Sequence, residues 1–371
     1  EFKLRKNSFS LMQSAGEKCA NYISSKVSKN KELLVICGPG NNGGDGFIIG
    51  NCLLKKGYKV KIFLTIPLKN KKTDNYKAFN ELNCKVFNLK DLHKELKRET
   101  NPIIVDCIFG TGLNKNVSPS IKNVIKVINK KRAFVFSIDI PTGIGSDNGQ
   151  IMGEAIKANL TLALHSKKIG NVLFPGVYFS GLVKVLDIGI RKSSNKIANN
   201  KIKENNPNLW INKKFPWKKY NSHKYSRGRV YIYGSLKNYI GASLLSSSAA
   251  IRCGAGSVTV VANKDTIDKY NQRFFSLLKI EINSKEELKN FLNDSSITSF
   301  LIGPGAGVNQ QTIDNVKLIS KFVSSVVIDA DAITSFTKNS KELFSILDKN
   351  KIITPKFIKS SIVAVLFLPN R

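Results

Sequence analysis

Short apolar runs recur at similar intervals along the first half of this chain, with polar or amphipathic stretches between them. Two of these stretches, at 47–56 and about 73–82, have a helix-like pattern. Repetition of strand, helix and strand predicts a parallel sheet covered on both faces, the arrangement of an α/β fold. The runs that we interpret as strands are 33–37, 58–64, 84–89, 102–109, 133–140, 161–166 and 183–190.

A second α/β pattern follows a polar stretch. Residues 191–208, RKSSNKIANNKIKENNPN, lack apolar periodicity, which is typical of a linker. The 371 residues suit two domains at roughly 150 residues each. We therefore predict one domain over 1–190, a linker over 191–208 and a second domain over 209–355. Strands of the second domain are expected at 229–234, 257–262, 299–303 and 324–329, with a helix at 242–254.

Composition limits the partners that the chain is expected to have. The formal net charge is +33, but the lysines are spread along the whole chain and no aromatic–basic repeat accompanies them. We interpret the charge as compositional bias and predict no specific nucleic-acid partner; a surface for nucleic acid or an acidic ligand is the alternative. Six scattered cysteines indicate reduced thiols and a cytoplasmic location. No apolar run reaches the ~18 residues of a membrane helix, so no membrane partner is expected.

The stretch CGPGNNGGDGFIIG, at 37–50, lies between an apolar run and a helix-like run. Amides at such a helix start form a site for an anion such as a phosphate. The glycine spacing is not G-x-G-x-x-G and the lysine of a P-loop is missing, so neither nucleotide fingerprint fits. Asn41, Asn42 and Asp45 add side-chain oxygens suited to a polar ligand or a hard cation. The alternative is a glycine-rich turn that only permits tight packing of helix on sheet.

Two further loops combine glycines with an aspartate. Asp106 lies in an apolar run ahead of Gly110 and Gly112, and Asp139 ends another run ahead of Thr142. Strand ends of a parallel sheet lie along one edge, where ligands bind. We therefore predict that the three loops form one site. Each aspartate taken alone is equally consistent with a cap or a turn.

These motifs, in this order, resemble the NAD(P)H-hydrate epimerase family. The segments LMQSAG, CGPGNNGGDG, DCIFGTGL, DIPTG and LDIGI carry the resemblance, which covers roughly residues 8–190. It implies a Rossmann-like three-layer parallel sheet and hydrated NADH or NADPH as the substrate; a preference between the two stays open. The residues that it implies for substrate binding are Asn41, Asn42, Gly43, Gly44, Asp45, Gly110, Thr111, Gly112, Leu113, Asn114, Lys115, Asn116 and Asp139.

The resemblance also implies a potassium ion and a possible homodimer. The ion would lie on Asn42, Asp106 and Thr142; the family usually has Ser at the last position, and Thr keeps the hydroxyl. The substrate carries a hydroxyl on a ring carbon next to nitrogen. The nitrogen lone pair can expel this group if an acid assists, and water can return from the other face. We expect one carboxylate, Asp139 or else Asp45, to act as acid and then as base. General acid–base catalysis of this kind accelerates a reaction by ~10²–10⁴-fold.

The second half resembles the opening of ADP- or ATP-dependent NAD(P)H-hydrate dehydratases, which are ribokinase-like. The segments GASLLSSSAAIRCGAGSVTVV, LIGPGAG and VVIDADAI stand in the order of that family. The resemblance implies contacts of the hydrate with Ala242 and with the loop Gly303–Gly307, including Gly305 and Gly307. His223 is either a further ligand contact or a loop histidine with a structural hydrogen bond.

The end of the chain departs from the dehydratase pattern. From Lys356 onward an apolar sequence replaces the histidine and acidic segment of the family, and its nucleotide loop and catalytic aspartate do not follow. We interpret 209–355 as a partial ribokinase-like domain and 356–371 as an atypical tail. We therefore expect an epimerase whose dehydratase half is inactive, with a separate dehydratase as a possible partner. The alternatives are a bifunctional enzyme recorded as a fragment and a non-catalytic nucleotide- or RNA-binding module.

Overall fold

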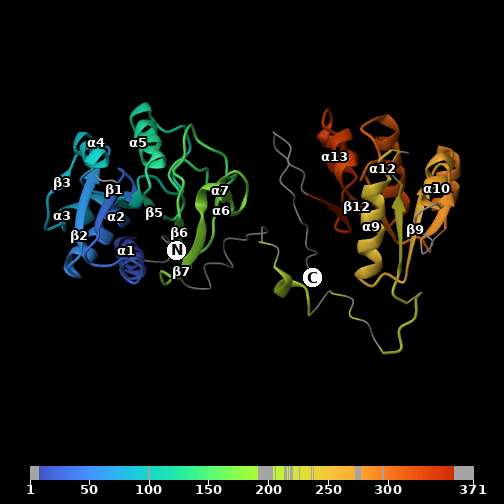
Figure 1. Ribbon diagram of the computed structural model, residues 1–371, viewed down its shortest axis with the longest axis horizontal. Helices are drawn as coiled ribbons and strands as arrows, with labels where there is room; N and C mark the ends of the chain where they lie inside the picture. The colour runs from blue at the N-terminus through green and yellow to red at the C-terminus, as the bar shows by residue number, and fades with distance from the viewer. Residues whose placement is uncertain are drawn as a thin grey trace. The chain divides into compact units, whose positions relative to one another are not determined.

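The computed structural model divides the chain into two compact units, Glu1–Asn200 and Lys201–Arg371, drawn as ribbons in Figure 1. The division falls inside the predicted linker, most of which lies outside the described residues; its described part includes one 3₁₀ turn, η1 (Pro207–Leu209). The predicted tail at 356–371 also lies outside them. The structure describes residues 8–98, 101–190, 204, 206–212, 215, 217, 220–224, 226–234, 236, 238–271, 277–294 and 296–354.

The first unit is built on a seven-stranded parallel sheet with the order β3-β2-β1-β4-β5-β6-β7. All seven predicted strands are present; β3 keeps two residues of its apolar run, and β4, β5 and β7 are also shorter than theirs. The strands are β1 (Glu32–Cys37), β2 (Lys59–Leu64), β3 (Val86–Phe87), β4 (Ile103–Cys107), β5 (Phe134–Ile138), β6 (Leu160–Leu164) and β7 (Leu182–Leu186).

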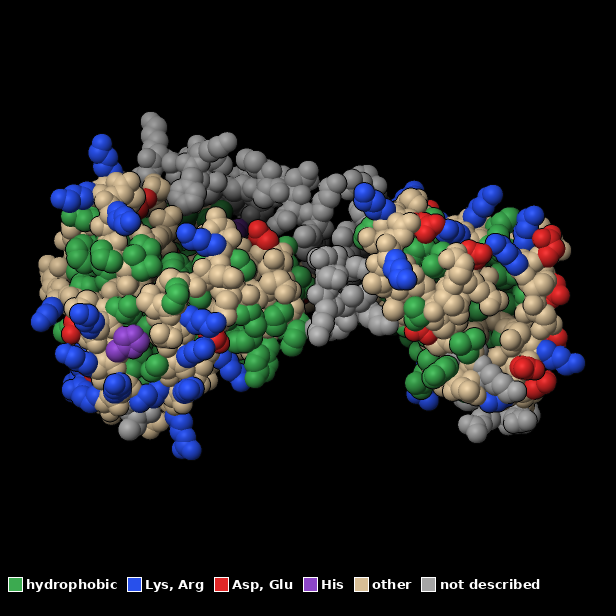
Figure 2. All heavy atoms as spheres, turned by 90° about the horizontal axis from the view of Figure 1, so that it is seen from above, with side chains coloured by type: hydrophobic (Ala, Val, Ile, Leu, Met, Phe, Trp, Pro, Cys, Tyr) green, Lys and Arg blue, Asp and Glu red, His purple; other side chains and the backbone are tan. Residues whose placement is uncertain are grey.

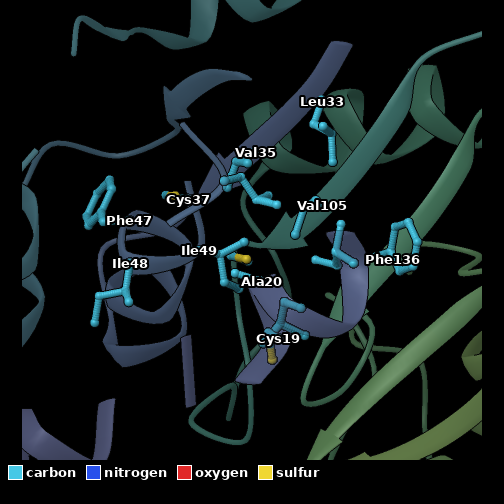
Figure 3. Packing of buried hydrophobic residues seen from close by; sticks show 14 of the residues in the cluster. Cys19, Ala20, Leu33, Val35, Cys37, Phe47, Ile48, Ile49, Val105 and Phe136 are labelled. Atoms are coloured by element: carbon cyan, nitrogen blue, oxygen red, sulfur yellow. The ribbon is translucent and has the colours of Figure 1, made fainter. Parts of the chain in front are cut away.

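Helices cover both faces of this sheet, as the sequence pattern predicts. Leu33 and Val35 of β1 belong to a core shared with α1 and α2, which Figure 3 shows from close by. The alternate residues Leu34 and Ile36 belong to a core shared with α4 and α5, so the unit has three layers. The helices are α1 (Ser8–Ser24), α2 (Asn41–Lys55), α3 (Asp74–Asn80), α4 (Leu89–Arg98), α5 (Pro119–Lys130), α6 (Ile169–Val172) and α7 (Gly176–Ser180).

Helix α2 begins earlier than its apolar pattern predicts, at Asn41 instead of residue 47. The prediction that NNGGDG is a loop is therefore wrong, although a glycine costs about 1 kcal/mol inside a helix. Close packing explains the difference. A Cβ added to Gly43 would lie 1.9 Å from the carbonyl oxygen of Gly38, and one added to Gly46 would lie 2.7 Å from the sulfur of Cys37. The glycines thus permit close packing of α2, as the alternative interpretation of this stretch expects.

The second unit has a six-stranded parallel sheet with the order β10-β9-β8-β11-β12-β13. The four predicted strands and the predicted helix are present. The sequence pattern does not predict β10 and β13, because LKIE and KII are too short to stand out. The strands are β8 (Arg229–Tyr233), β9 (Ser257–Ala262), β10 (Leu278–Glu281), β11 (Ser299–Ile302), β12 (Ser325–Ile328) and β13 (Lys351–Ile353). The helices are α9 (Ile240–Arg252), α10 (Lys264–Asn271), α11 (Lys285–Leu292), α12 (Gln310–Phe322), α13 (Ala330–Ser335) and α14 (Ser340–Ser345).

The surface of each unit matches the spread of lysines along the sequence. Figure 2 shows Lys and Arg side chains scattered over the visible face of both units, without one dense cluster. All six cysteines are free, and Cys19, Cys37 and Cys107 are buried. No helix in the described part of the chain is both long enough and apolar enough to cross a membrane.

Candidate active site

The carboxyl ends of β1, β4 and β5 lie side by side at one edge of the first sheet. The loop at 38–40, the loop at 108–118 and the loop that begins at Asp139 all leave the sheet there. The chain runs outward from β1 to β2 and β3 and then returns to β4 on the other side of β1. The strand order therefore reverses between β1 and β4. Ligands of open α/β sheets bind at such a reversal. The prediction that the three loops share one edge is confirmed.

Asp106 is a fully buried carboxylate in β4. It accepts hydrogen bonds from the Thr142 hydroxyl at 2.6 Å, the Thr142 N–H at 2.9 Å and the Ser137 hydroxyl at 2.8 Å. The N–H of Phe109 in turn donates to the Thr142 hydroxyl oxygen at 3.0 Å. Burial raises the pKa of Asp106, and the hydrogen bonds from Thr142 and Ser137 oppose that shift. This network ties the segment after β4 to the segment after β5.

Asn42, in the first turn of α2, is 8% exposed. Within the described residues, neither its amide oxygen nor its amide nitrogen makes a hydrogen bond, although both atoms are buried. A buried polar group without a partner costs about 1–3 kcal/mol, so we expect a ligand at this position. Asn42 packs against Gly110, where an added Cβ would lie 3.3 Å from the Asn42 Cβ. Asn42 therefore adjoins the segment that Thr142 holds.

The three predicted potassium ligands supply only oxygen donors. Asn42 adds an unsatisfied amide, Asp106 a buried negative charge and Thr142 a hydroxyl. A hard monovalent cation fits such a set. No group of three or more His, Cys, Asp and Glu side chains is placed to hold a metal among the residues that the structure describes. The predicted potassium site contains a single carboxylate, so it does not belong to this class of metal site.

Asp45 and Asp139 are the two other buried carboxylates of this edge. Asp45 lies one helical turn beyond Asn42 on α2, and Asp139 directly follows β5. Burial holds the pKa of Asp45 well above its usual range, the charge of Asp139 raises it further, and the charge of Lys168 lowers it. Asp45, Asp139 and Lys168 therefore form one electrostatically coupled group.

Lys168 is a site residue that the sequence does not single out. Its ammonium forms an ion pair with Asp139 Oδ1. The signal for it is its place just beyond the predicted strand 161–166, at the same edge of the sheet. Because the chain holds 59 lysines and arginines, one more lysine near a strand end does not stand out.

The remaining residues expected to hold the substrate differ in exposure. Asn41 is exposed, as is most of the loop 110–116, and Gly112 has no atom within 4 Å of an added Cβ. The Ser146 hydroxyl donates to the Thr111 carbonyl oxygen at 3.5 Å, so the loop 110–116 adjoins the segment after β5. Gly43 and Gly44 are buried and face Gly38 and Met12, which leaves only their backbone groups for a ligand.

The second unit has a pocket of about 710 Å³ at the carboxyl edge of its own sheet. It contains Ala242, Gly305 and Gly307, the three residues that the sequence predicts there. Gly305 and Gly307 have φ angles of 70° and 86°, a conformation that favours glycine. Asp331 was not predicted; its carboxylate accepts a hydrogen bond from the Gly307 N–H at 3.0 Å. The full lining is Asn238, Tyr239, Gly241, Ala242, Gly305, Gly307, Val308 and Asp331.

His223 is exposed and is not part of this lining. The N–H of Ser226 donates to His223 Nδ1 at 3.4 Å, and the Ser226 hydroxyl donates to the His223 carbonyl oxygen at 2.9 Å. Of the two interpretations from the sequence, the structural hydrogen bond is therefore present.

Known families match the two units in order along the chain. The family described as YjeF-related protein N-terminus matches residues 8–170. The family described as NAD(P)H-hydrate dehydratase matches residues 230–358, which extends three residues into the predicted tail.

Curated relatives are similar to nearly the whole chain. The bifunctional NAD(P)H-hydrate repair enzyme Nnr of Dictyoglomus turgidum is 32% identical over 369 residues, which cover 94% of this chain and 70% of the relative. The protein of the same name from Thermofilum pendens is 27% identical over 345 residues, with 88% and 64% covered. Among solved structures, the crystal structure of yeast ynu0 is 23% identical and covers 50% of this chain and 80% of its own, with a TM-score of 0.41. The chain spans about two thirds of the length of the two curated relatives.

Proposed function

Because the chain belongs to the family of bifunctional NAD(P)H-hydrate repair enzymes, we propose that its first unit interconverts the R and S forms of hydrated NADH and NADPH. The observation that carries this proposal is the coupled, buried pair of Asp45 and Asp139 at the carboxyl edge of the sheet. Epimerisation at a carbon that bears a hydroxyl needs a proton donor and a proton acceptor. This pair supplies both.

The start of α2 is our proposed site for a phosphate of the substrate. The first N–H groups of a helix have no partner within the helix, and the helix dipole makes this end positive. Lys115, in the exposed loop 110–116, adds a positive charge near the same edge. The nicotinamide end of the substrate would then lie toward Asp45 and Asp139.

We propose that the two carboxylates divide the proton transfers. Asp45, with its raised pKa, gives a proton to the leaving hydroxyl, which departs as water while the ring nitrogen holds the positive charge. Water then adds to the other face of the ring and gives a proton to Asp139. The reverse conversion uses the same groups in the opposite order, and proton exchange with solvent water restores the starting state of both carboxylates before the next turnover in the same direction. The sequence favours a single carboxylate, Asp139, for both steps, and the raised pKa of Asp45 supports the division.

Potassium would be held by Asn42, Asp106 and Thr142. When bound, it supplies a positive charge that balances the buried Asp106 carboxylate. Thermal unfolding in KCl and in tetramethylammonium chloride tests this, since a ligand at 100 times its Kd stabilises a protein by about 2.7 kcal/mol. The expected gain in KCl occurs for the wild type and Thr142→Ser but is lost in Thr142→Val. Equal melting of the wild type in both salts would contradict the ion site.

The epimerase activity is tested with a mixture of R and S hydrates and a separate dehydratase that uses only the S form. The dehydratase alone restores reduced cofactor quickly from the S fraction, and then only at the slow rate of spontaneous epimerisation. Adding the purified chain should restore the R fraction as well, followed by absorbance of the reduced nicotinamide. No acceleration over spontaneous epimerisation would overturn the proposal.

For the second unit, we propose that the pocket at Ala242, Gly305 and Gly307 binds the S hydrate and that ADP or ATP drives its dehydration. The expectation that this half is inactive has no support in the comparisons, because the dehydratase family matches 230–358. Incubation of the whole chain with S hydrate and either nucleotide tests the activity. If neither ADP nor ATP leads to recovery of reduced cofactor, the chain is restricted to epimerisation.

The free thiols of the chain fit a reducing compartment, and on that ground we propose a cytoplasmic location. A homodimer stays a prediction from family resemblance, and sedimentation equilibrium of the purified chain tests it. A mass of one chain at all concentrations would contradict it.

A further inference from the structure

Lys168 is held more firmly than a surface lysine. It lies between β6 and α6, and its backbone N–H donates to the Asn171 side chain at 2.8 Å. Its ammonium donates to Asp139 Oδ1 and to the carbonyl oxygens of Leu164 and Ser166, at 2.8 and 3.1 Å. An ammonium has three protons, so each one has an acceptor. The lysine has therefore one fixed position and no proton left over for another acceptor.

The same contacts hold the Asp139 carboxylate in one orientation. Oδ1 accepts from Lys168 and from the Leu164 N–H at 3.2 Å. No donor to Oδ2 occurs within the described part of the chain, and the side chain keeps 12% exposure. One oxygen is thus anchored and the other stays open to a ligand.

The backbone around this pair is also constrained. Asp139 and His165, each just beyond a neighbouring strand of the sheet, have φ angles of 71° and 64°. Residues other than glycine persist in this region only where the surrounding structure holds them, and they concentrate at functional sites. The N–H of Asp139 donates to the Leu162 carbonyl oxygen at 2.8 Å, which fixes the turn that carries the carboxylate.

We propose that Lys168 is a positioning residue for the epimerase, an assignment that rests on the function proposed above. Its ammonium fixes Asp139 as the proton acceptor, with Oδ2 aimed at the substrate, and leaves Asp45 as the proton donor. The described titratable groups that face Asp139 are Lys168, Asp45 from α2 and the Cys19 thiol from α1. Of these three only Lys168 is positive, and it makes its ion pair with Asp139.

The test compares Lys168→Met with Lys168→Arg in the full chain, by the coupled assay with excess dehydratase. Lys168→Met should lower kcat on the order of 10²-fold with little change in KM, because a misplaced catalytic group costs about this much. Lys168→Arg should restore part of the loss because it keeps the charge. Lys126→Met, which removes an exposed lysine on α5, is the matched control and should keep wild-type kinetics. Melting temperatures show that each variant is folded, and Lys168→Gln, which keeps a donor, replaces Lys168→Met if that variant unfolds.

Two readouts separate positioning from a purely structural role. The first is a loss confined to kcat, with KM and melting temperature unchanged, because a misplaced carboxylate slows the proton transfer without weakening substrate binding. In an Asp139→Asn background, Lys168→Met should cause little further loss, because both changes remove the same function.

Each outcome decides the assignment. Wild-type kinetics in Lys168→Met, a rise in KM with kcat unchanged, or losses that multiply in the double variant would overturn the role of Lys168 while leaving the epimerase intact. An inactive wild-type chain would instead overturn the proposed function, and this assignment with it.

Discussion

The carboxyl edges of the two sheets carry different kinds of site. Three buried carboxylates occur among the described residues, Asp45, Asp106 and Asp139, and all of them belong to the edge of the first sheet. The pocket of the second unit is lined mainly by glycines and short side chains, and its carboxylate, Asp331, is only half-buried. The same parallel-sheet architecture thus provides one edge suited to proton transfer and another suited to holding a ligand.

The difference shows what a proton-transfer site requires of its surroundings. A buried charge is costly unless it is paired or hydrogen-bonded. Asp106 meets this condition through Thr142 and Ser137, and Asp139 meets it through Lys168. Asp45 has a raised pKa and stays protonated more readily. The three carboxylates therefore have different partners although all of them lie at one edge.

The largest expected effect is a loss of epimerisation at the carboxyl edge of the first sheet. Asp139→Asn should reduce epimerisation by ~10²–10⁴-fold, the range of general acid–base catalysis. Asparagine also tolerates the left-handed backbone of this position, so the fold should persist. Hydrate binding to the second unit should not change. Asp147→Asn, an exposed aspartate in the following loop, is the control. Wild-type turnover in Asp139→Asn would remove Asp139 from catalysis.

A second prediction concerns the close packing under the first edge. Gly43→Ala should destabilise the chain by about 3 kcal/mol, because its Cβ would lie 1.9 Å from the Gly38 carbonyl oxygen. This exceeds the ~1 kcal/mol gained from the better helix propensity of alanine. Gly40→Ala, with nothing within 4 Å of the new Cβ, should cost less than about 1 kcal/mol. Calorimetry of the two variants measures the difference, and equal melting would contradict the packing role.

The second edge is tested by narrowing its pocket. Ala242→Val should weaken binding of the S hydrate to the second unit about tenfold, or ~1.4 kcal/mol, and leave epimerisation unchanged. Ala249→Val places the same side chain at an exposed position of the same helix and controls for the lower helix propensity of valine. Titration calorimetry with the hydrate measures both variants. A loss of epimerisation in Ala242→Val would break the separation of the two edges.

The smallest expected effect is a pH-dependent change in the free energy of unfolding. The pKa of Asp45 is raised in the native state, so the native carboxyl keeps its proton to a higher pH. In the unfolded chain the same carboxyl releases its proton near pH 4. Stability therefore falls as pH rises from that value through the native pKa. Asp45→Asn should remove this loss and raise the melting temperature at neutral pH by about 2–4 °C, the effect of roughly 1 kcal/mol. The melting temperatures of Asp45→Asn and of the wild type are compared from pH 4 to 8. A difference between them that is the same at every pH would contradict a protonated Asp45.

Much of the fold follows from local features of the sequence. Apolar runs predict the strands because a parallel sheet buries both faces of each strand, as in β1. A parallel sheet also brings all strand ends to one edge, so Asp106 and Asp139 could be placed at a common site before any contact was known. The family motifs then indicate the chemistry.

Tertiary structure alone decided the rest. The glycines of 43–46 predict a loop, yet they are helical because α2 packs closely against Gly38 and the sulfur of Cys37. The link between Asp139 and Lys168 joins the ends of different strands, and no local pattern contains it. Local propensity and periodicity act over a few residues, whereas burial and charge coupling depend on segments that only folding brings together.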